Sequence, residues 1–335
     1  MNVGIRSIGY FIPDEIHDAA WIAAHSGIPE AVIRDKFGIQ QVHKAGLTDT
    51  VSSMGVAAAR RCLGDFDPAD LDMVVYCGSE YKDFYLFNCA ARIQCELGAV
   101  NAAVFEIHNL CSAGVWGLKV LKAMMIDDPE LKHVLLVSSS RESDLIDYTD
   151  ATGRFMFNFG DGAAAVLLER DLDRNVILQT AMIADGRFAT DVSVPGIGCQ
   201  RFADPAPLRD ADRFLRVTDP VAMKERLDPI TMENFAAVIA SAATKSAFGA
   251  DHIDYLAPIF MKRSILRLLL DRFGLGEDNT FLLEEYGHCQ SADCFISLAE
   301  GARAGNLRPG HNAVLVSAGT GYTWAATAVH WGPVN

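Results

Sequence analysis

The hydrophobic positions of this chain follow two alternating patterns. Largely apolar runs at Leu71–Cys77, Ala103–Ile107 and Val134–Ser138 predict strands, and the run at Leu71–Cys77 reads as a buried strand. Before the first run and between the last two, apolar positions recur every three to four residues, at Thr50–Leu63 and Cys111–Met125, which predicts helices. Strands that alternate with helices in this way indicate a layered α/β fold. Further elements of the first half are expected as a strand at Met1–Arg6, a helix at Ala90–Leu97 and a strand at Ala163–Leu168.

The second half of the chain repeats this order of strands and helices. Its expected elements are a helix at Met232–Phe248, a strand at Ile253–Ala257, a helix at Ile265–Phe273, a strand at Phe281–Leu283, a helix at Ser291–Ala304 and strands at Ala313–Ser317 and Thr323–Trp331. Because the two series match, we expect an internal duplication, with an N-terminal half at residues 1–172 and a C-terminal half at residues 173–335. Residues 196–230 are richer in polar residues and proline, so they are expected to form an insertion or lid.

The composition excludes several classes of protein. Half of the 335 residues are hydrophobic and 21% are charged, which is typical of a globular protein. No apolar run approaches the ~18 residues that span a bilayer, and the first residues do not resemble a signal peptide. We therefore expect a cytoplasmic protein that does not enter membranes. The formal net charge of −14 argues against nucleic acid as a partner. The eight cysteines form no CxxC pair and the histidines show no ligand spacing, so we expect no metal site.

Cys111 is the first candidate for covalent catalysis. It follows the apolar run that ends at Ile107, after a short polar link, and it precedes small residues that read as the start of a helix. A thiol at a helix N-terminus faces unpaired backbone N–H groups and the positive end of the helix dipole, and both favour the nucleophilic thiolate. The alternative is that Cys111 is an ordinary buried cysteine.

The duplication supplies a partner for this cysteine. In the second half, the loop equivalent to the one that carries Cys111 spans Glu284 to Asp293 and contains His288. If the two halves pack about a pseudo-twofold axis, both loops lie near that axis. Cys111 and His288 would then face each other as a Cys/His pair, although they are far apart in the sequence.

Six short motifs, in a fixed order, extend this interpretation to nearly the whole chain. They are Lys36–Ile39, Ala91–Gly98, Cys111–Gly114, Phe157–Ala165, Tyr286–His288 and Ser317–Trp324. With them, the chain resembles the thiolase-fold condensing enzymes, specifically relatives of ketoacyl-acyl-carrier-protein synthase III and hydroxymethylglutaryl-CoA synthase. The resemblance implies a five-layered αβαβα fold from two duplicated halves, and a homodimer.

The resemblance also implies roles for particular residues. Cys111 would accept an acyl group from a CoA or acyl-carrier-protein thioester, and no cofactor would be needed. The oxyanion would lie between the backbone N–H of Cys111 and one from the turn formed by Gly319, Thr320 and Gly321. The alternative for these glycines is a plain turn between strands.

Two positions depart from the pattern of synthase III enzymes. Ile259 follows Pro258 where the resemblance expects a histidine, and His288 follows Gly287 where it expects an asparagine. Ile259 cannot donate a hydrogen bond to an enolate, so the stabilisation that decarboxylative condensation requires is weakened. A Cys–His pair remains, and it suffices for acyl transfer to a heteroatom.

Asp293 is the best candidate to hold the second ring nitrogen of His288. The alternative is a carboxylate that only stabilises the start of its own helix. A Cys-His-Asp arrangement resembles the acyltransferase branch of synthase III homologues, which makes esters or amides in specialised metabolism. The leading hypothesis is therefore an acyltransferase that moves an acyl group through Cys111 to a small-molecule hydroxyl or amine acceptor, with His288 as base.

Two other hypotheses stay open. Glu80 follows a predicted strand, and a glutamate at the corresponding position is the general acid/base of hydroxymethylglutaryl-CoA synthase. Glu80 would then serve a carbon–carbon condensing enzyme in place of the missing histidine, unless it is only an exposed loop residue. The third hypothesis is a non-catalytic partner subunit of a synthase. The acyl donor, CoA or carrier protein, is also open; basic residues on or before one predicted helix would offer a carrier protein a docking surface, namely Lys262, Arg263, Arg267 and Arg272.

Overall fold

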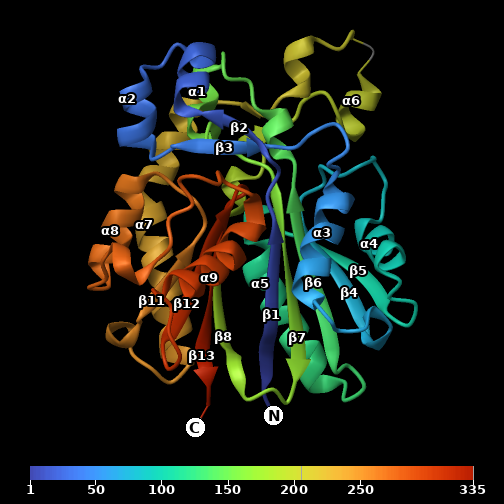
Figure 1. The fold of residues 1–335 in the computed structure, drawn as a ribbon. Coiled ribbons are helices and arrows are strands. Elements are labelled where there is room, and N and C mark those ends of the chain that lie inside the picture. Colours follow the sequence, from blue (N-terminus) through green and yellow to red (C-terminus); the bar gives the residue numbers. More distant parts are fainter. Residues whose placement is uncertain (205, 335) are drawn as a thin grey trace.

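A nine-stranded mixed sheet organises the residues that the computed structural model describes, which are 1–204 and 206–334 (Figure 1). The sheet contains, in spatial order, β11 (Tyr255–Pro258), β12 (Asn312–Gly319), β13 (Thr323–Pro333), β8 (Arg174–Ala184), β1 (Val3–Phe11), β7 (Gly162–Arg170), β6 (His133–Ser140), β4 (Met73–Gly78) and β5 (Ala103–His108). Strands of the first half of the chain lie on one side and strands of the second half on the other. They meet where Gly4 of β1 pairs with Val176 of β8.

The helices form three further layers. The longer ones are α3 (Val51–Leu63), α4 (Cys89–Leu97), α5 (Ala113–Asp127), α7 (Pro220–Lys245), α8 (Arg263–Arg272) and α9 (Asp293–Ala304). Helices α3 and α4 pack on the first group of strands, and α7 and α8 pack on the second. Helices α5 and α9 contact strands of both groups (Figure 1). The two groups of strands, although joined in one sheet, therefore act as two layers, and the order is helix, strands, helix, strands, helix.

Strand β7 shows why the apolar runs of the sequence become strands. Its side chains point to opposite faces in turn, as in any strand. Ala164, Val166 and Leu168 belong to the central core, while Ala165 and Leu167 pack with α3 in an outer core. Because both faces are covered, every position from Ala163 to Leu168 is apolar and no alternation is visible in the sequence.

Smaller elements lie at the end of the sheet where the active-site loops emerge. They are α1 (Ala19–Ser26), α2 (Glu30–Val32), α6 (Cys199–Ala203) and two ribbons, β2 (Glu15–Asp18) with β3 (Gln41–Lys44) and β9 (Val192–Ser193) with β10 (Arg216–Val217). Among the described residues, no helix is long and apolar enough to cross a membrane.

The structure corrects the sequence-based elements in two places. No strand forms at Phe281–Leu283, which is irregular. The predicted insertion at residues 196–230 is too long, because α7 begins at Pro220, where Asp219 caps the helix and proline occupies its first turn. The boundary between halves at residues 172 and 173 falls in the turn between β7 and β8. Since one continuous sheet crosses that turn, the division into two halves stays a prediction.

Candidate active site

Cys111 lies at the carboxyl end of β5, in a single 3-10 turn formed by Leu110–Ser112. Helix α5 begins directly afterwards, so the helix starts two residues later than the sequence predicts. Leu110 has a φ of +48°, which is unusual for a residue with a side chain and marks a sharp backbone turn. This turn presents the thiol at the N-terminal end of α5, where the helix dipole is positive.

The second half of the chain repeats the same local structure. Gln290–Ala292 form a 3-10 turn immediately before α9, and Gln290 has a φ of +58°. The two turns are packed together: a Cβ atom added to Gly114 would lie 2.7 Å from the backbone oxygen of Ser291. Only a glycine permits the start of α5 to approach α9 so closely.

This packing brings Cys111, His288 and Asp293 into one hydrogen-bonded row, with His288 in the middle. His288 Nε2 lies 3.3 Å from Cys111 Sγ, and His288 Nδ1 lies 2.6 Å from Asp293 Oδ2. Asp293 is fully buried and also accepts the backbone N–H groups of Cys289 and Phe260, each at 2.7 Å. These bonds fix the carboxylate, which in turn fixes the orientation of the imidazole ring.

The balance of burial and neighbouring charges raises the pKa of both His288 and Cys111. Burial lowers the pKa of His288, but the negative charges of Asp293 and the Cys111 thiolate outweigh it and hold that pKa well above its ordinary value. Burial raises the pKa of the Cys111 thiol, and the adjacent His288 acts in the opposite direction. His288 is thus a strengthened base beside a thiol that needs one.

The end of β12 and the glycine turn that follows it lie against the backbone of Cys111. A Cβ atom on Gly319 would lie 3.3 Å from the backbone nitrogen of Cys111, and Ser317 Oγ donates a 2.5 Å hydrogen bond to the backbone oxygen of Cys111. Thr320 lines a cavity together with Cys111. Gly321 has a φ of +127°, a conformation that glycine adopts readily. The predicted oxyanion site is therefore assembled around Cys111 in space, and its catalytic role stays a prediction.

The cavity beside Cys111 has a volume of about 880 Å³. One wall is polar and carries Ser79, Glu80, Tyr81, Glu142 and Asp144. The rest is mostly apolar: Leu145 and Met156 come from the segment between β6 and β7, and Val192, Ile197, Leu208 and Leu215 from the segments around β9 and β10. Arg213 also lines the cavity. This volume and lining suit an acyl chain and a small acceptor.

Glu80 lines this cavity but does not join the row of Cys111, His288 and Asp293. Its side chain is 71% exposed, and its Oε1 atom lies 2.6 Å from Nδ1 of His108. The structure therefore places Glu80 at the rim, where its predicted role as a general base stays untested. Ile259 is buried directly after β11, and its backbone N–H donates to Val316. An apolar side chain thus occupies the position where the resemblance expects a histidine.

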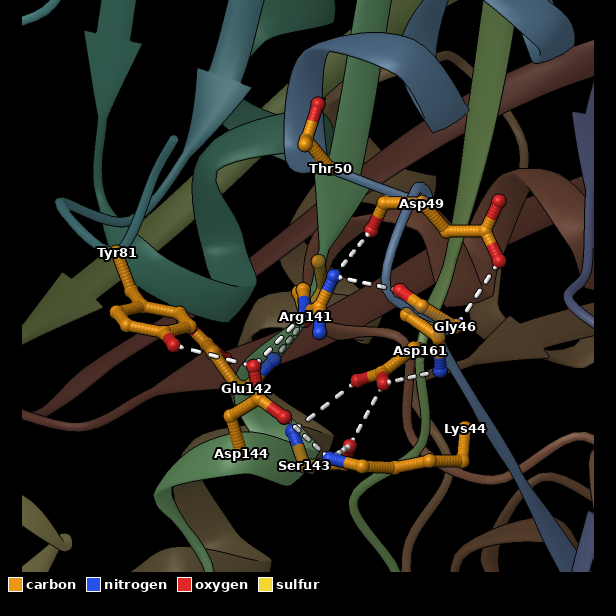
Figure 2. Close-up of polar contacts among 12 residues, drawn as sticks. Lys44, Gly46, Asp49, Thr50, Tyr81, Arg141, Glu142, Ser143, Asp144 and Asp161 are labelled. Atoms are coloured by element: carbon orange, nitrogen blue, oxygen red, sulfur yellow. Dashed lines mark hydrogen bonds and ion pairs between the residues drawn. The ribbon is translucent and has the colours of Figure 1, made fainter. Parts of the chain in front are cut away.

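The sequence did not single out Glu142 or Gln290. Glu142 follows β6 and Gln290 opens the 3-10 turn before α9, and both are buried at the cavity wall. Gln290 Nε2 donates a 2.5 Å hydrogen bond to Glu142 Oε1. A signal was present for Glu142, since it follows a buried strand as Cys111 and Glu80 do. Next to it, Lys44, Tyr81, Arg141 and Asp144 form a polar cluster (Figure 2).

The basic residues near α8 are largely paired with carboxylates. Arg263 pairs with Glu277 and Glu284, Arg267 with Glu277, and Arg272 with Glu233. Lys262 lies over the ring of Phe37. A carrier protein would have to compete with these glutamates for the arginines.

Comparison with known proteins supports the fold and the family. Residues 105–186 match the family model described as 3-oxoacyl-[acyl-carrier-protein (ACP)] synthase III, and residues 243–331 match the model of its C-terminal part. The chain is 29% identical over 307 residues to the beta-ketoacyl-[acyl-carrier-protein] synthase III of Synechocystis sp., with 89% of each chain covered. It is 25% identical over 333 residues to the enzyme of the same name from Clostridioides difficile, with 98% of each covered.

Solved structures agree with this assignment at the level of the fold. The 3-oxoacyl-[acyl-carrier-protein] synthase III of Aquifex aeolicus superposes with a TM-score of 0.84 at 21% identity, covering 98% of this chain and 100% of that one. The priming beta-ketosynthase of the R1128 polyketide pathway superposes with a TM-score of 0.86 at 23% identity, covering 99% and 97%. The predicted thiolase-like α/β fold is confirmed. Matches in both halves of the chain to the two parts of one family show that it belongs to the ketoacyl-acyl-carrier-protein synthase III-like family of thiolase-fold enzymes.

Proposed function

We propose that this protein is an acyltransferase that uses Cys111 as a transient acyl carrier. The thiolate attacks a CoA or acyl-carrier-protein thioester, and the carrier thiol leaves with a proton from His288. An acceptor hydroxyl or amine then gives a proton to His288 and attacks the new thioester on Cys111. The acyl–sulfur bond breaks, so the ester or amide is released and Cys111 leaves as a thiolate beside protonated His288. Thioester exchange is redox-neutral, so the proposed reaction needs no metal and no cofactor.

One observation carries this proposal: His288 lies between Cys111 and Asp293, while Ile259 occupies the position of the missing histidine. The Cys-His-Asp row supplies what acyl transfer to a heteroatom requires, namely a nucleophile, a base and a group that orients the base. Ile259 adds no donor to an enolate oxygen. We further propose a role in specialised metabolism, a cytoplasmic location and a homodimer, as the family resemblance implies.

The test begins with the acyl-enzyme. The protein is incubated with octanoyl-CoA and, separately, with octanoyl-acyl carrier protein, and its intact mass is measured. We expect one octanoyl group, absent from the Cys111→Ala variant, and its loss when an acceptor is added. No acylation from either donor would contradict the proposal and would favour a non-catalytic partner subunit.

A carbon–carbon condensing enzyme is the second candidate, because the relatives named above carry that activity in their names and Glu80 lines the cavity. Carboxyl-labelled malonyl thioester distinguishes the two. Release of labelled CO₂ coupled to a β-keto product would favour condensation. Transfer of the acyl group without CO₂ release would favour the acyltransferase.

A further inference from the structure

Three neighbouring parallel strands deliver three reactive side chains to one edge of the sheet. Strand β4 pairs in parallel with β5 on one side and with β6 on the other. Directly after their carboxyl ends come Glu80 from β4, Cys111 from β5 and Glu142 from β6, and all three line the cavity. The carboxyl edge of parallel strands is where ligands of α/β proteins usually bind. Cys111 and Glu80 already have candidate roles. Glu142 has none, either from the family resemblance or from the proposed acyl transfer.

The direct hydrogen-bond donors of Glu142 are neutral, and the nearest positive charge that acts on it is that of His288. The Oε1 atom of Glu142 accepts the amide of Gln290 at 2.5 Å, and the hydroxyl of Ser79 is its second side-chain donor. No lysine or arginine pairs with it within residues 1–204 and 206–334. A buried carboxylate without a cation is costly unless something compensates its charge.

The neighbouring carboxylates of the same wall are compensated. Figure 2 shows Lys44, Arg141 and Tyr81 gathered around Asp144, with Arg141 Nε 2.7 Å from its Oδ2 atom. Glu80 lies beside His108. Burial acts to raise the pKa of Asp144, but the bonds from Lys44 and Arg141 lower it overall. Burial raises the pKa of Glu142, and the hydrogen bonds from Ser79 and Gln290 together with the charge of His288 do not reverse that rise.

We propose that Glu142 selects an amine acceptor: it binds the ammonium group in the cavity and removes one proton beside the thioester on Cys111. This inference rests on the acyl transfer proposed above and narrows its acceptor class. An ammonium group would give Glu142 a charged hydrogen bond, which neither Gln290 nor Ser79 provides. The apolar lining of the cavity fits a hydrocarbon body on the same molecule.

The chemical step balances as follows. The ammonium gives one proton to the Glu142 carboxylate and becomes a neutral amine. Its nitrogen attacks the carbonyl carbon of the thioester, so that a C–N bond forms, and its second proton passes to His288 Nε2. When the C–S bond breaks, His288 returns this proton to Cys111 Sγ. The products are an amide and the free thiol, and Glu142 releases its proton to water in the cavity.

The closing experiment measures amine binding without any acyl donor. Iodoacetamide alkylates free Cys111, and peptide mass spectrometry separates this site from the exposed Cys95 and Cys199. Alkylation of Cys111 is followed at pH 7 with increasing 1-hexylamine or, as a neutral match, 1-hexanol. For each ligand we determine the concentration that halves the rate of Cys111 alkylation. In the Glu142→Gln variant we expect this concentration to rise at least tenfold for hexylamine and to stay within twofold for hexanol.

Two further variants make the result decisive. Glu142→Asp keeps the charge and is expected to keep most of the protection by hexylamine. Glu225→Gln removes the same charge from an exposed position on α7 and is expected to behave as wild type. Equal protection of wild type and Glu142→Gln by hexylamine would overturn the assignment of Glu142. Because alkylation needs no thioester, that result is independent of whether Cys111 accepts an acyl group, so the two proposals fail separately.

Discussion

His288 Nε2 lies 3.3 Å from Cys111 Sγ although 177 positions separate the two residues in the chain. The contact exists because the 3-10 turns that precede α5 and α9 pack against each other where the two halves meet. Each half alone would carry only part of the site. The packing of these two turns therefore places a thiol beside an imidazole, and we propose that they act as nucleophile and base.

Asp293→Asn tests whether the charge behind His288 matters to transfer. The amide nearly preserves the shape of the side chain but cannot stabilise an imidazolium, and it offers the wrong partner to the ring N–H. We expect the rate of acyl transfer to fall about 10²- to 10⁴-fold, with a much smaller change in donor KM. Stopped-flow measurement of Cys111 acylation reports the effect.

Asp293→Ala serves as the contrasting variant. It leaves the backbone N–H groups of Cys289 and Phe260 without their acceptor, at about 1–3 kcal/mol for each buried group. A large loss of stability is therefore expected from the alanine variant. If Asp293→Asn transferred acyl groups at the wild-type rate, Asp293 would be a purely structural residue.

The raised pKa of His288 predicts a pH dependence of stability. A group whose pKa is raised on folding stabilises the folded state fully below its unfolded value, near 6.5, and loses this contribution as pH rises through the folded value. The extra stability of wild type over Asp293→Asn should therefore be largest near pH 6 and shrink at higher pH. Urea unfolding at several pH values and NMR titration of the imidazole nitrogens measure both quantities.

Ile259→His tests whether the missing histidine decides the reaction. Restoring a donor at this position should increase release of CO₂ from malonyl thioester at least tenfold, since an enolate oxygen would gain a hydrogen bond. Ile259→Leu is the matched control, because it keeps an apolar side chain of the same volume. Unchanged CO₂ release from Ile259→His would show that this position does not determine the choice between transfer and condensation.

The sequence predicted the parts of the fold in which burial dictates the pattern. β4, β6 and β7 are covered on both faces, so their apolar runs are unbroken and visible. β8 mixes buried with partly exposed residues and was not recognised. In the first turns of α7 only Met223 is buried, and a second proline, Pro229, lies inside the helix, so this part reads as an insertion. Only Asp219 and Pro220 mark the true start.

Within the site, the sequence predicted what the duplication places together and missed what a neighbouring strand contributes. Cys111, His288 and Asp293 lie in equivalent loops, so their proximity followed from symmetry. Glu142 follows β6, and a glutamate after a strand is usually a solvated loop residue. Its burial depends on Gln290 and Ser79, which no local pattern connects to it.

Two glycines on α5 give a matched pair for the packing behind the site. A Cβ atom on Gly114 would lie 2.7 Å from the oxygen of Ser291 and 2.9 Å from the ring of Phe295, whereas one on Gly117 would only contact Leu136 at 3.4 Å. Gly114→Ala must push α9 away and should cost about 1–3 kcal/mol of unfolding free energy. Gly117→Ala should instead stabilise the helix by up to about 1 kcal/mol, because alanine favours helix more than glycine does.

The same two glycine variants distinguish a loss of folding stability from a change in the distance between Cys111 and His288. Gly114 lies where α5 contacts the turn that follows His288. Its alanine variant should therefore also move Cys111 away from His288. Alkylation of Cys111 by iodoacetamide at pH 7 should then slow in Gly114→Ala and stay at the wild-type rate in Gly117→Ala. Equal alkylation rates together with a loss of stability in Gly114→Ala would mean that the Cys111–His288 contact is held by other bonds, such as that from Ser317 to the backbone of Cys111.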